Sequence, residues 1–150
     1  MQKMKYLAIV LIMAFFLGSC GEYHTVLNKG LNTDKYKMAV EMYDKKEYKK
    51  AIALFEKIMG PYANKPQMER IQYMISDSYF QEKNYAMASY YFSKFITNYP
   101  ESTKVEEAAY YSAKSYFLAA PIYSRDQEDT YKALTAYQNY IDRYPNSELI

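Results

Sequence analysis

The chain has 150 residues, with 19 Lys and Arg against 17 Asp and Glu and a single cysteine. Two of the basic residues, Lys3 and Lys5, belong to a predicted N-terminal signal, so 17 basic residues face 17 acidic ones in the rest of the chain. This balance leaves the chain without the overall basic charge typical of nucleic-acid binding, and the lone cysteine excludes an intramolecular disulfide framework.

The first predicted element is an uncharged stretch at residues 6–17, which is followed by Gly18, Ser19 and Cys20. As a helix this stretch would measure about 18 Å, whereas the hydrocarbon layer of a membrane is ~30 Å thick. We therefore expect a cleaved secretory signal at residues 1–19 and not a membrane span.

Small residues directly before a cysteine resemble the bacterial lipobox, in which the cysteine is diacylated and becomes the first residue of the mature protein. The resemblance implies lipidation of Cys20, with residues 20–33 as a lipidated tether to the membrane. Lipidation also accounts for the only thiol of an exported chain, and two or three acyl chains hold a protein far more firmly than one. The alternative is an ordinary signal peptide with an incidental cysteine.

A repeat of 37 residues follows this segment. Tyr36, Tyr73 and Tyr110 keep that spacing, and so do Ala51 and Ala88. Self-similarity at this period predicts stacked helix pairs, because one pair cannot bury its apolar face without a neighbour. The predicted helices are residues 34–46, 48–59, 67–82, 85–98, 103–120 and 127–143.

The segments between the predicted helices differ in length. Residues 60–66, which contain two prolines, predict a long loop after the second helix. Thr103 with Glu106 predicts a capping box at the start of the fifth helix. The third repeat is longer than the others, and we place its extra residues at 119–130, as either a contact element or tolerated surface.

A small residue followed four positions later by an aromatic one occurs three times in register, in Ala51-x-x-x-Phe55, Ala88-x-x-x-Phe92 and Ala133-x-x-x-Tyr137. A proline eight residues after the aromatic closes two of these motifs, at Pro100 and Pro145. The pattern resembles the tetratricopeptide repeat family. It implies an all-α solenoid of about three antiparallel helix pairs in a domain at residues 34–150, with repeats at about 34–66, 67–102 and 103–147.

The corner Tyr99-Pro100-Glu101-Ser102 recurs as Tyr144-Pro145-Asn146-Ser147, where a fourth repeat would begin. We expect that the chain is cut off there, and the alternative is that a partner covers its last repeat. Together with the lipobox and the repeats, this corner resembles the BamD family of outer-membrane protein assembly lipoproteins. The resemblance covers the N-terminal three of that family's five repeats. It implies a lipid anchor on the periplasmic face of the outer membrane, and binding to the barrel-forming subunit BamA and to unfolded outer-membrane proteins.

Other functions stay open beside this one. A different periplasmic tetratricopeptide lipoprotein would coordinate cell-wall synthesis or envelope constriction, and a glycan-binding lipoprotein would serve uptake. An enzyme is not expected, because His24 is the only histidine and the four glycines form no phosphate-binding loop. Metal-ligand spacing is absent from the sequence as well, so we expect no metal and no cofactor.

The first helix of each predicted pair carries an aromatic stripe. Tyr36 and Tyr43 are seven residues apart, almost two helical turns, and therefore point the same way with Val40 between them. By the geometry of the resembling family, this stripe lines a concave groove that suits an extended peptide with aromatic and aliphatic side chains. The alternative is that the stripe packs between helices. The predicted partner-binding residues are Tyr36, Val40, Tyr43, Tyr73, Asp77, Phe80, Tyr110, Lys114 and Phe117.

Overall fold

The computed structural model describes residues 21–120 and 127–149. The predicted signal peptide, the predicted lipidation site at Cys20 and the middle of the expected insertion therefore lie outside the described residues. All regular structure in the described part is helical, and none of its helices is long and apolar enough to cross a bilayer.

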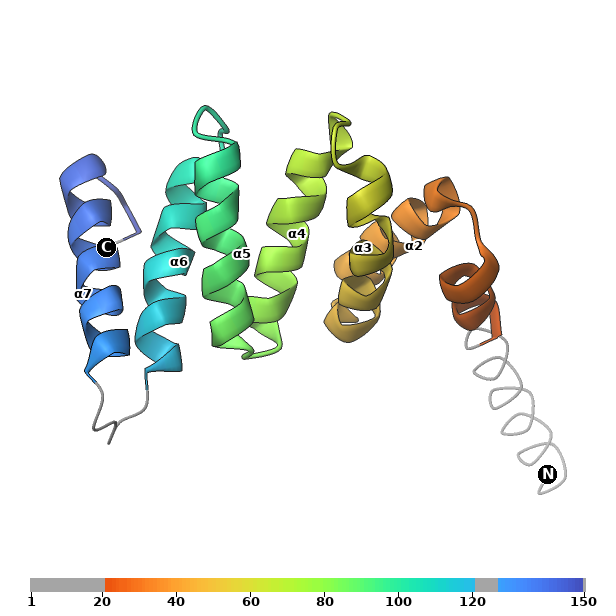
Figure 1. Cartoon of the computed structure of the whole chain (residues 1–150), viewed down its shortest axis with the longest axis horizontal. Helices are drawn as coiled ribbons and strands as arrows, with labels where there is room; N and C mark the ends of the chain where they lie inside the picture. The colour runs from red at the N-terminus through yellow and green to blue at the C-terminus, as the bar shows by residue number, and fades with distance from the viewer. Residues whose placement is uncertain (1–20, 121–126, 150) are drawn as a thin grey trace, which may run out of the picture.

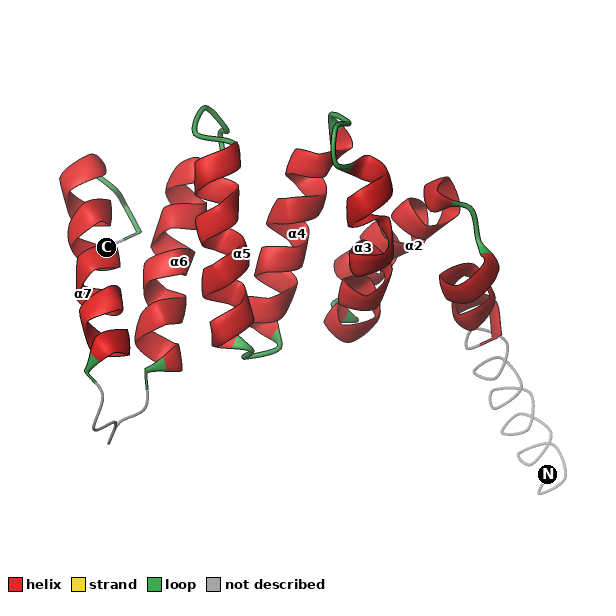
Figure 2. Ribbon diagram, viewed as in Figure 1, coloured by secondary structure: helices red, strands yellow, loops and turns green. Residues whose placement is uncertain are grey.

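After residue 31, six helices follow one another along the chain, and they stand side by side (Figure 1). They are α2 (Asn32–Asp44), α3 (Tyr48–Tyr62), α4 (Gln67–Gln81), α5 (Tyr85–Asn98), α6 (Val105–Ala119) and α7 (Glu128–Arg143). Each packs mainly on the helices before and after it, and α4 also contacts α6. Figure 2 shows short loops between the helices and no strand in the described residues. The array of antiparallel helix pairs predicted from the repeat is confirmed.

The repeated motif supplies the core of this array. Ala51 and Ala88 are completely buried, and so are the aromatic residues four positions later, Phe55 and Phe92. A small residue lets two helices approach closely, and the aromatic ring then fills the space toward the next helix. In the third pair Ala133 is also buried, at 3 % exposure.

The turns within the first two pairs have the same geometry. Lys46 and Lys83, 37 residues apart, both adopt a left-handed backbone, with φ of 61° and 59°. In the first turn the N–H of Glu47 donates to the carbonyl of Met42 at 2.8 Å, and the second turn repeats this bond. This is the Schellman arrangement, which satisfies the last carbonyls of a helix and normally favours glycine at the left-handed position.

The predicted loop at residues 60–66 is wrong in its first half. Helix α3 continues through Pro61 to Tyr62. The Tyr62 side chain is 6 % exposed and its ring stacks on Tyr36 with centroids 5.6 Å apart, so packing of this ring holds the additional turn in place. Pro61 is tolerated because it interrupts the backbone bonds only in the last turn.

The predicted capping box at Thr103 is also wrong. Helix α6 begins at Val105, and its first turn receives no side-chain cap. Instead, the Ser102 hydroxyl accepts the N–H of Lys104 at 3.1 Å, which stabilises the corner before the helix. Ser and Thr side chains compete for such local backbone bonds, so the sequence pattern allowed either arrangement.

Residues 21–29 form a further helix, which the sequence analysis did not predict. Tyr23 is 8 % exposed and belongs to the hydrophobic core, and Val26 and Leu27 pack against that core. The spacing i, i+3, i+4 places all three side chains on one face of the helix. The Tyr23 hydroxyl donates to the carbonyl oxygen of Lys50 at 3.4 Å. This helix closes the N-terminal end of the solenoid (Figure 1).

Candidate functional site

The nine predicted binding residues all belong to α2, α4 and α6, the first helices of the three pairs. We call the side of the molecule formed by these helices the first-helix face. Two clusters on this face hold six of the nine residues, Tyr43, Tyr73, Asp77, Phe80, Tyr110 and Lys114.

The first cluster links successive repeats through tyrosine hydroxyls and carboxylates. Tyr43 on α2 donates to Oδ2 of Asp77 on α4 at 2.5 Å, and the Tyr73 hydroxyl on α4 lies beside the Glu107 carboxylate on α6. Burial raises the pKa of both tyrosines above the ordinary value of 10.0, and the neighbouring negative carboxylate raises it further. Both hydroxyls therefore stay protonated at neutral pH.

A groove with a volume of about 400 Å³ opens beside this cluster. The Nζ atom of Lys104 lies 2.6 Å from a carboxylate oxygen of Glu107 and 5.2 Å from the centre of the Tyr73 ring, which it covers. The groove thus combines aromatic surface with charged groups of both signs. Its lining residues are Tyr43, Asp44, Pro66, Glu69, Arg70, Tyr73, Met74, Phe95 and Lys104.

The second cluster surrounds Lys114 of α6. Its Nζ atom lies 5.9 Å from the centre of the Phe80 ring and 5.4 Å from that of Tyr110. The Phe80 ring also meets Tyr111 edge to face, with centroids 4.8 Å apart. A cation between two aromatic rings is attracted to both, which holds the lysine stem along the face.

The remaining three predicted residues lie elsewhere. Tyr36 stacks on Tyr62 and serves the packing of the first pair, while Val40 packs against the core. Phe117 is 61 % exposed near the end of α6, and among the described residues its ring meets that of Tyr137, with centroids 6.4 Å apart. The stripe is thus divided between packing and surface, and helical spacing alone does not separate these roles.

The sequence did not predict the charged residues beside Tyr73, chiefly Lys104 of the groove and Glu107, its ion-pair partner. A signal for the carboxylate exists in the sequence, because Glu107 follows Tyr73 by the same 34 residues that separate Asp77 from Tyr43. That interval joins a tyrosine to the first helix of the next repeat. No sequence signal that we recognise indicates that Lys104 covers the Tyr73 ring.

A larger cavity, about 690 Å³, lies between α5 and α7 and was not predicted. Its lining includes Ala109 and Ser112 of α6, with Tyr140 on α7 and Tyr144 just beyond it. The Tyr144 hydroxyl is buried and has no hydrogen-bond partner among the described residues.

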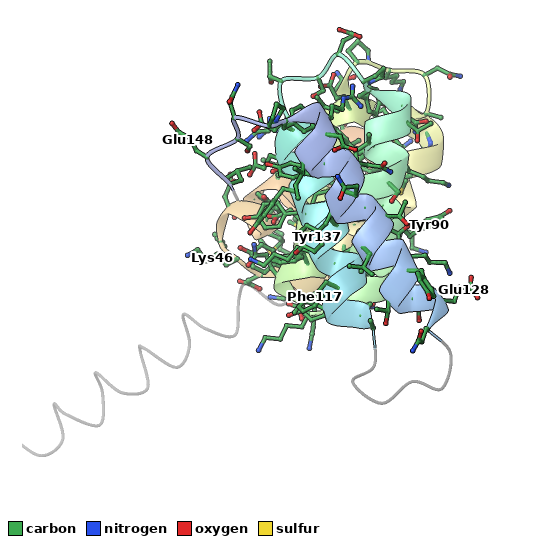
Figure 3. All side chains as sticks on the ribbon, turned by 90° about the vertical axis from the view of Figure 1, so that its left-hand side faces the viewer. Lys46, Tyr90, Phe117, Glu128, Tyr137 and Glu148 are labelled. Carbon is green, nitrogen blue, oxygen red and sulfur yellow. The ribbon has the colours of Figure 1, made fainter. Side chains whose placement is uncertain are left out.

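Apolar side chains are exposed mainly on the third helix pair. Leu134 on α7 is 61 % exposed, whereas Ser89, the corresponding residue of α5, is 5 % exposed. The difference arises because α6 packs over α5, while no other described helix packs over the corresponding side of α7. Figure 3 views the molecule from this end, with Phe117 and Tyr137 labelled.

Within residues 21–120 and 127–149, no three metal-ligating side chains gather at one place. Comparison with protein families gives one match, to the model described as YfiO, outer membrane lipoprotein, over residues 29–149. None of the curated proteins matches the sequence.

Proposed function

The chain belongs to the YfiO, or BamD, family of outer membrane lipoproteins, and on this premise we propose that it is a scaffold of the machinery that assembles outer-membrane barrel proteins. The family match over residues 29–149 carries this proposal. The scaffold binds a BamA-type subunit, unfolded outer-membrane proteins or both, and it performs no chemistry itself.

We place the membrane attachment at Cys20, through lipid on its sulfur. The lipobox and the lipoprotein description of the family support this assignment. Cys20→Ala should release the protein into the soluble periplasmic fraction, because no described helix can span the bilayer in place of the lipid. His24→Ala, close by and exposed, is the control and should leave the protein on the membrane. Continued membrane retention of Cys20→Ala would reject the anchor.

The first-helix face is our candidate for the surface that binds protein chains. Tyr43 is held by its bond to the Asp77 carboxylate of the next repeat, and the Tyr73 ring packs on Phe95, so the groove beside them is preformed. Arg70 and Lys104 offer charged donors at its rim, and Lys114 lies between two rings further along. An extended polypeptide presents both carbonyl acceptors and apolar side chains, and this surface can meet both needs.

Site-specific photo-crosslinking in cells tests this surface. A crosslinking amino acid at Arg70 or at Lys114 should capture a BamA-type subunit or unfolded barrel proteins. The matched control is Tyr90 of α5, which is 48 % exposed and points away from the side that carries Lys46 (Figure 3). Equal capture from Tyr90 would reject the first-helix face as the binding surface.

The same experiment separates the other candidate functions. Capture of cell-wall enzymes alone would favour a scaffold for wall synthesis or envelope constriction. A glycan-binding lipoprotein would show no protein capture at these positions, and its purified domain would gain thermal stability with saccharides.

A further inference from the structure

We propose that the lipid anchor is joined to the solenoid without slack, so that the turn between α2 and α3 lies against the headgroups of the bilayer. This inference rests on the proposed lipidation of Cys20. It concerns how the body of the protein is oriented once the lipid is in the membrane.

The helix at residues 21–29 is the structural basis of the inference. Its first buried side chain is Tyr23, which contacts Lys50 in two ways. The Tyr23 hydroxyl donates to the Lys50 carbonyl, and the Lys50 Nζ atom lies 5.5 Å from the centre of the Tyr23 ring. Val26 and Leu27 add apolar contacts to the same core one turn later. The segment next to the lipid is therefore packed on the first helix pair.

Chain length determines how much freedom this packing leaves. Tyr23 comes three positions after Cys20, so even an extended backbone spans at most roughly 11 Å between them. If residues 20–33 were a flexible tether, its ends would lie about 20 Å apart on average and up to about 50 Å apart when stretched. The span of roughly 11 Å between Cys20 and Tyr23 is comparable with the ~10 Å over which surface charges act at moderate salt. The first helix pair is consequently held at the membrane surface.

The contact between Tyr23 and Lys50 identifies which end of this pair faces the lipid. Lys50 lies in the first turn of α3, directly after the turn between α2 and α3. In Figure 1 the helix of residues 21–29 begins at the lower edge of the molecule. Asn64 is exposed just beyond the opposite end of α3. Because α3 has 15 residues, Asn64 lies about 22 Å from the turn between α2 and α3.

The charges of this turn are compatible with an anionic surface. Lys45 pairs with Glu41, and Lys50 pairs with Glu47. Lys46 occupies the exposed tip of the turn and forms no ion pair with the described residues. The tip therefore presents one positive group to the headgroups, while its neighbours are nearly balanced.

Spin labels on the mature lipidated chain test the proposal. Because lipid occupies the sulfur of Cys20, Lys46→Cys and Asn64→Cys each introduce a unique free thiol for a nitroxide. The chains are reconstituted in vesicles of phosphatidylethanolamine and phosphatidylglycerol that contain a lipid with a nickel-chelating headgroup. We expect relaxation of the nitroxide by nickel to be several-fold stronger at position 46 than at position 64. Equal relaxation at the two positions would overturn the inference.

A flexible Gly-Ser linker of about ten residues, inserted between Cys20 and Gly21, is the matched control. It leaves the packed helix intact but lengthens the connection to the lipid, so the difference between the two positions should disappear. A difference that survives the insertion would overturn the fixed anchor. Flotation of the vesicles separates this outcome from failure of the proposed anchor. A chain that does not float overturns both proposals, whereas a floating chain with equal relaxation overturns the orientation alone.

Discussion

The hydrogen bond between Tyr43 and Asp77 joins the first repeat to the second, and its removal should weaken the solenoid measurably. Tyr43→Phe deletes the hydroxyl that donates to Oδ2 of Asp77 at 2.5 Å and keeps the ring. Hydrogen bonds to charged groups contribute about 1.5–3 kcal/mol. Both side chains are only half-buried, so water can partly replace the lost donor. We therefore expect a loss of about 1–2 kcal/mol in the free energy of unfolding.

Urea unfolding followed by circular dichroism measures this loss. The control is Tyr48→Phe, because the Tyr48 ring meets Tyr43 edge to face at 5.7 Å but its hydroxyl makes no hydrogen bond to another described residue. Its effect should stay within about 0.5 kcal/mol. In the background of Asp77→Ala, Tyr43→Phe should have almost no further effect, which isolates the pairwise energy. An equal loss in both backgrounds would refute the assignment of the energy to this bond.

Three other predictions concern the core, the turns and the response to pH. Phe92→Ala should cost about 3–5 kcal/mol in thermal unfolding because Phe92 is completely buried, whereas Tyr90→Ala at an exposed position should cost far less. Lys83→Gly should raise stability by up to about 1 kcal/mol in urea, since Lys83 has a left-handed backbone with φ of 59°; a loss would contradict this strain. The raised pKa values of Tyr43 and Tyr73 in the folded state imply that the same two tyrosines ionise at lower pH in the unfolded chain. The contribution of these tyrosines to the free energy of unfolding is therefore complete below about pH 10 and declines above it. The double variant with Phe at both positions should therefore lose less stability between about pH 9 and about pH 11 than the parent does, and equal losses would count against the buried tyrosines as the cause.

The helix pairs could be predicted from the sequence because their signal is periodic and repeated. Ala88 and Phe92, with their equivalents 37 residues earlier, mark the same core positions in successive pairs. The helix at residues 21–29 has a weaker signal. Tyr23, Val26 and Leu27 have helical spacing, but a segment this short depends on tertiary packing to be stable. The extension of α3 past Pro61 likewise depends on where the Tyr62 ring packs.

The candidate site was predictable only in part for a related reason. Spacing placed Tyr43 and Tyr73 on the correct helices, but it could not show that each hydroxyl lies beside a carboxylate of the next repeat. The spacing also predicted the same role for Tyr36 and Tyr73, although the Tyr36 ring is stacked on the Tyr62 ring. Contacts between repeats depend on how adjacent helices are rotated, and this rotation is not encoded in the period of a single helix.

Packing that runs almost entirely from each helix to the next has a mechanical consequence. In such an array, a few degrees of rotation at each interface between neighbouring helices add up along the length of the molecule. Every interface keeps its own apolar contacts during this change. The groove beside Tyr73 is lined by residues of α2, α4 and α5, so rotation at the interfaces between helices would alter its width slightly. If the groove binds polypeptide as proposed, small rotations of this kind would adapt it to segments of different thickness while each helix stays folded.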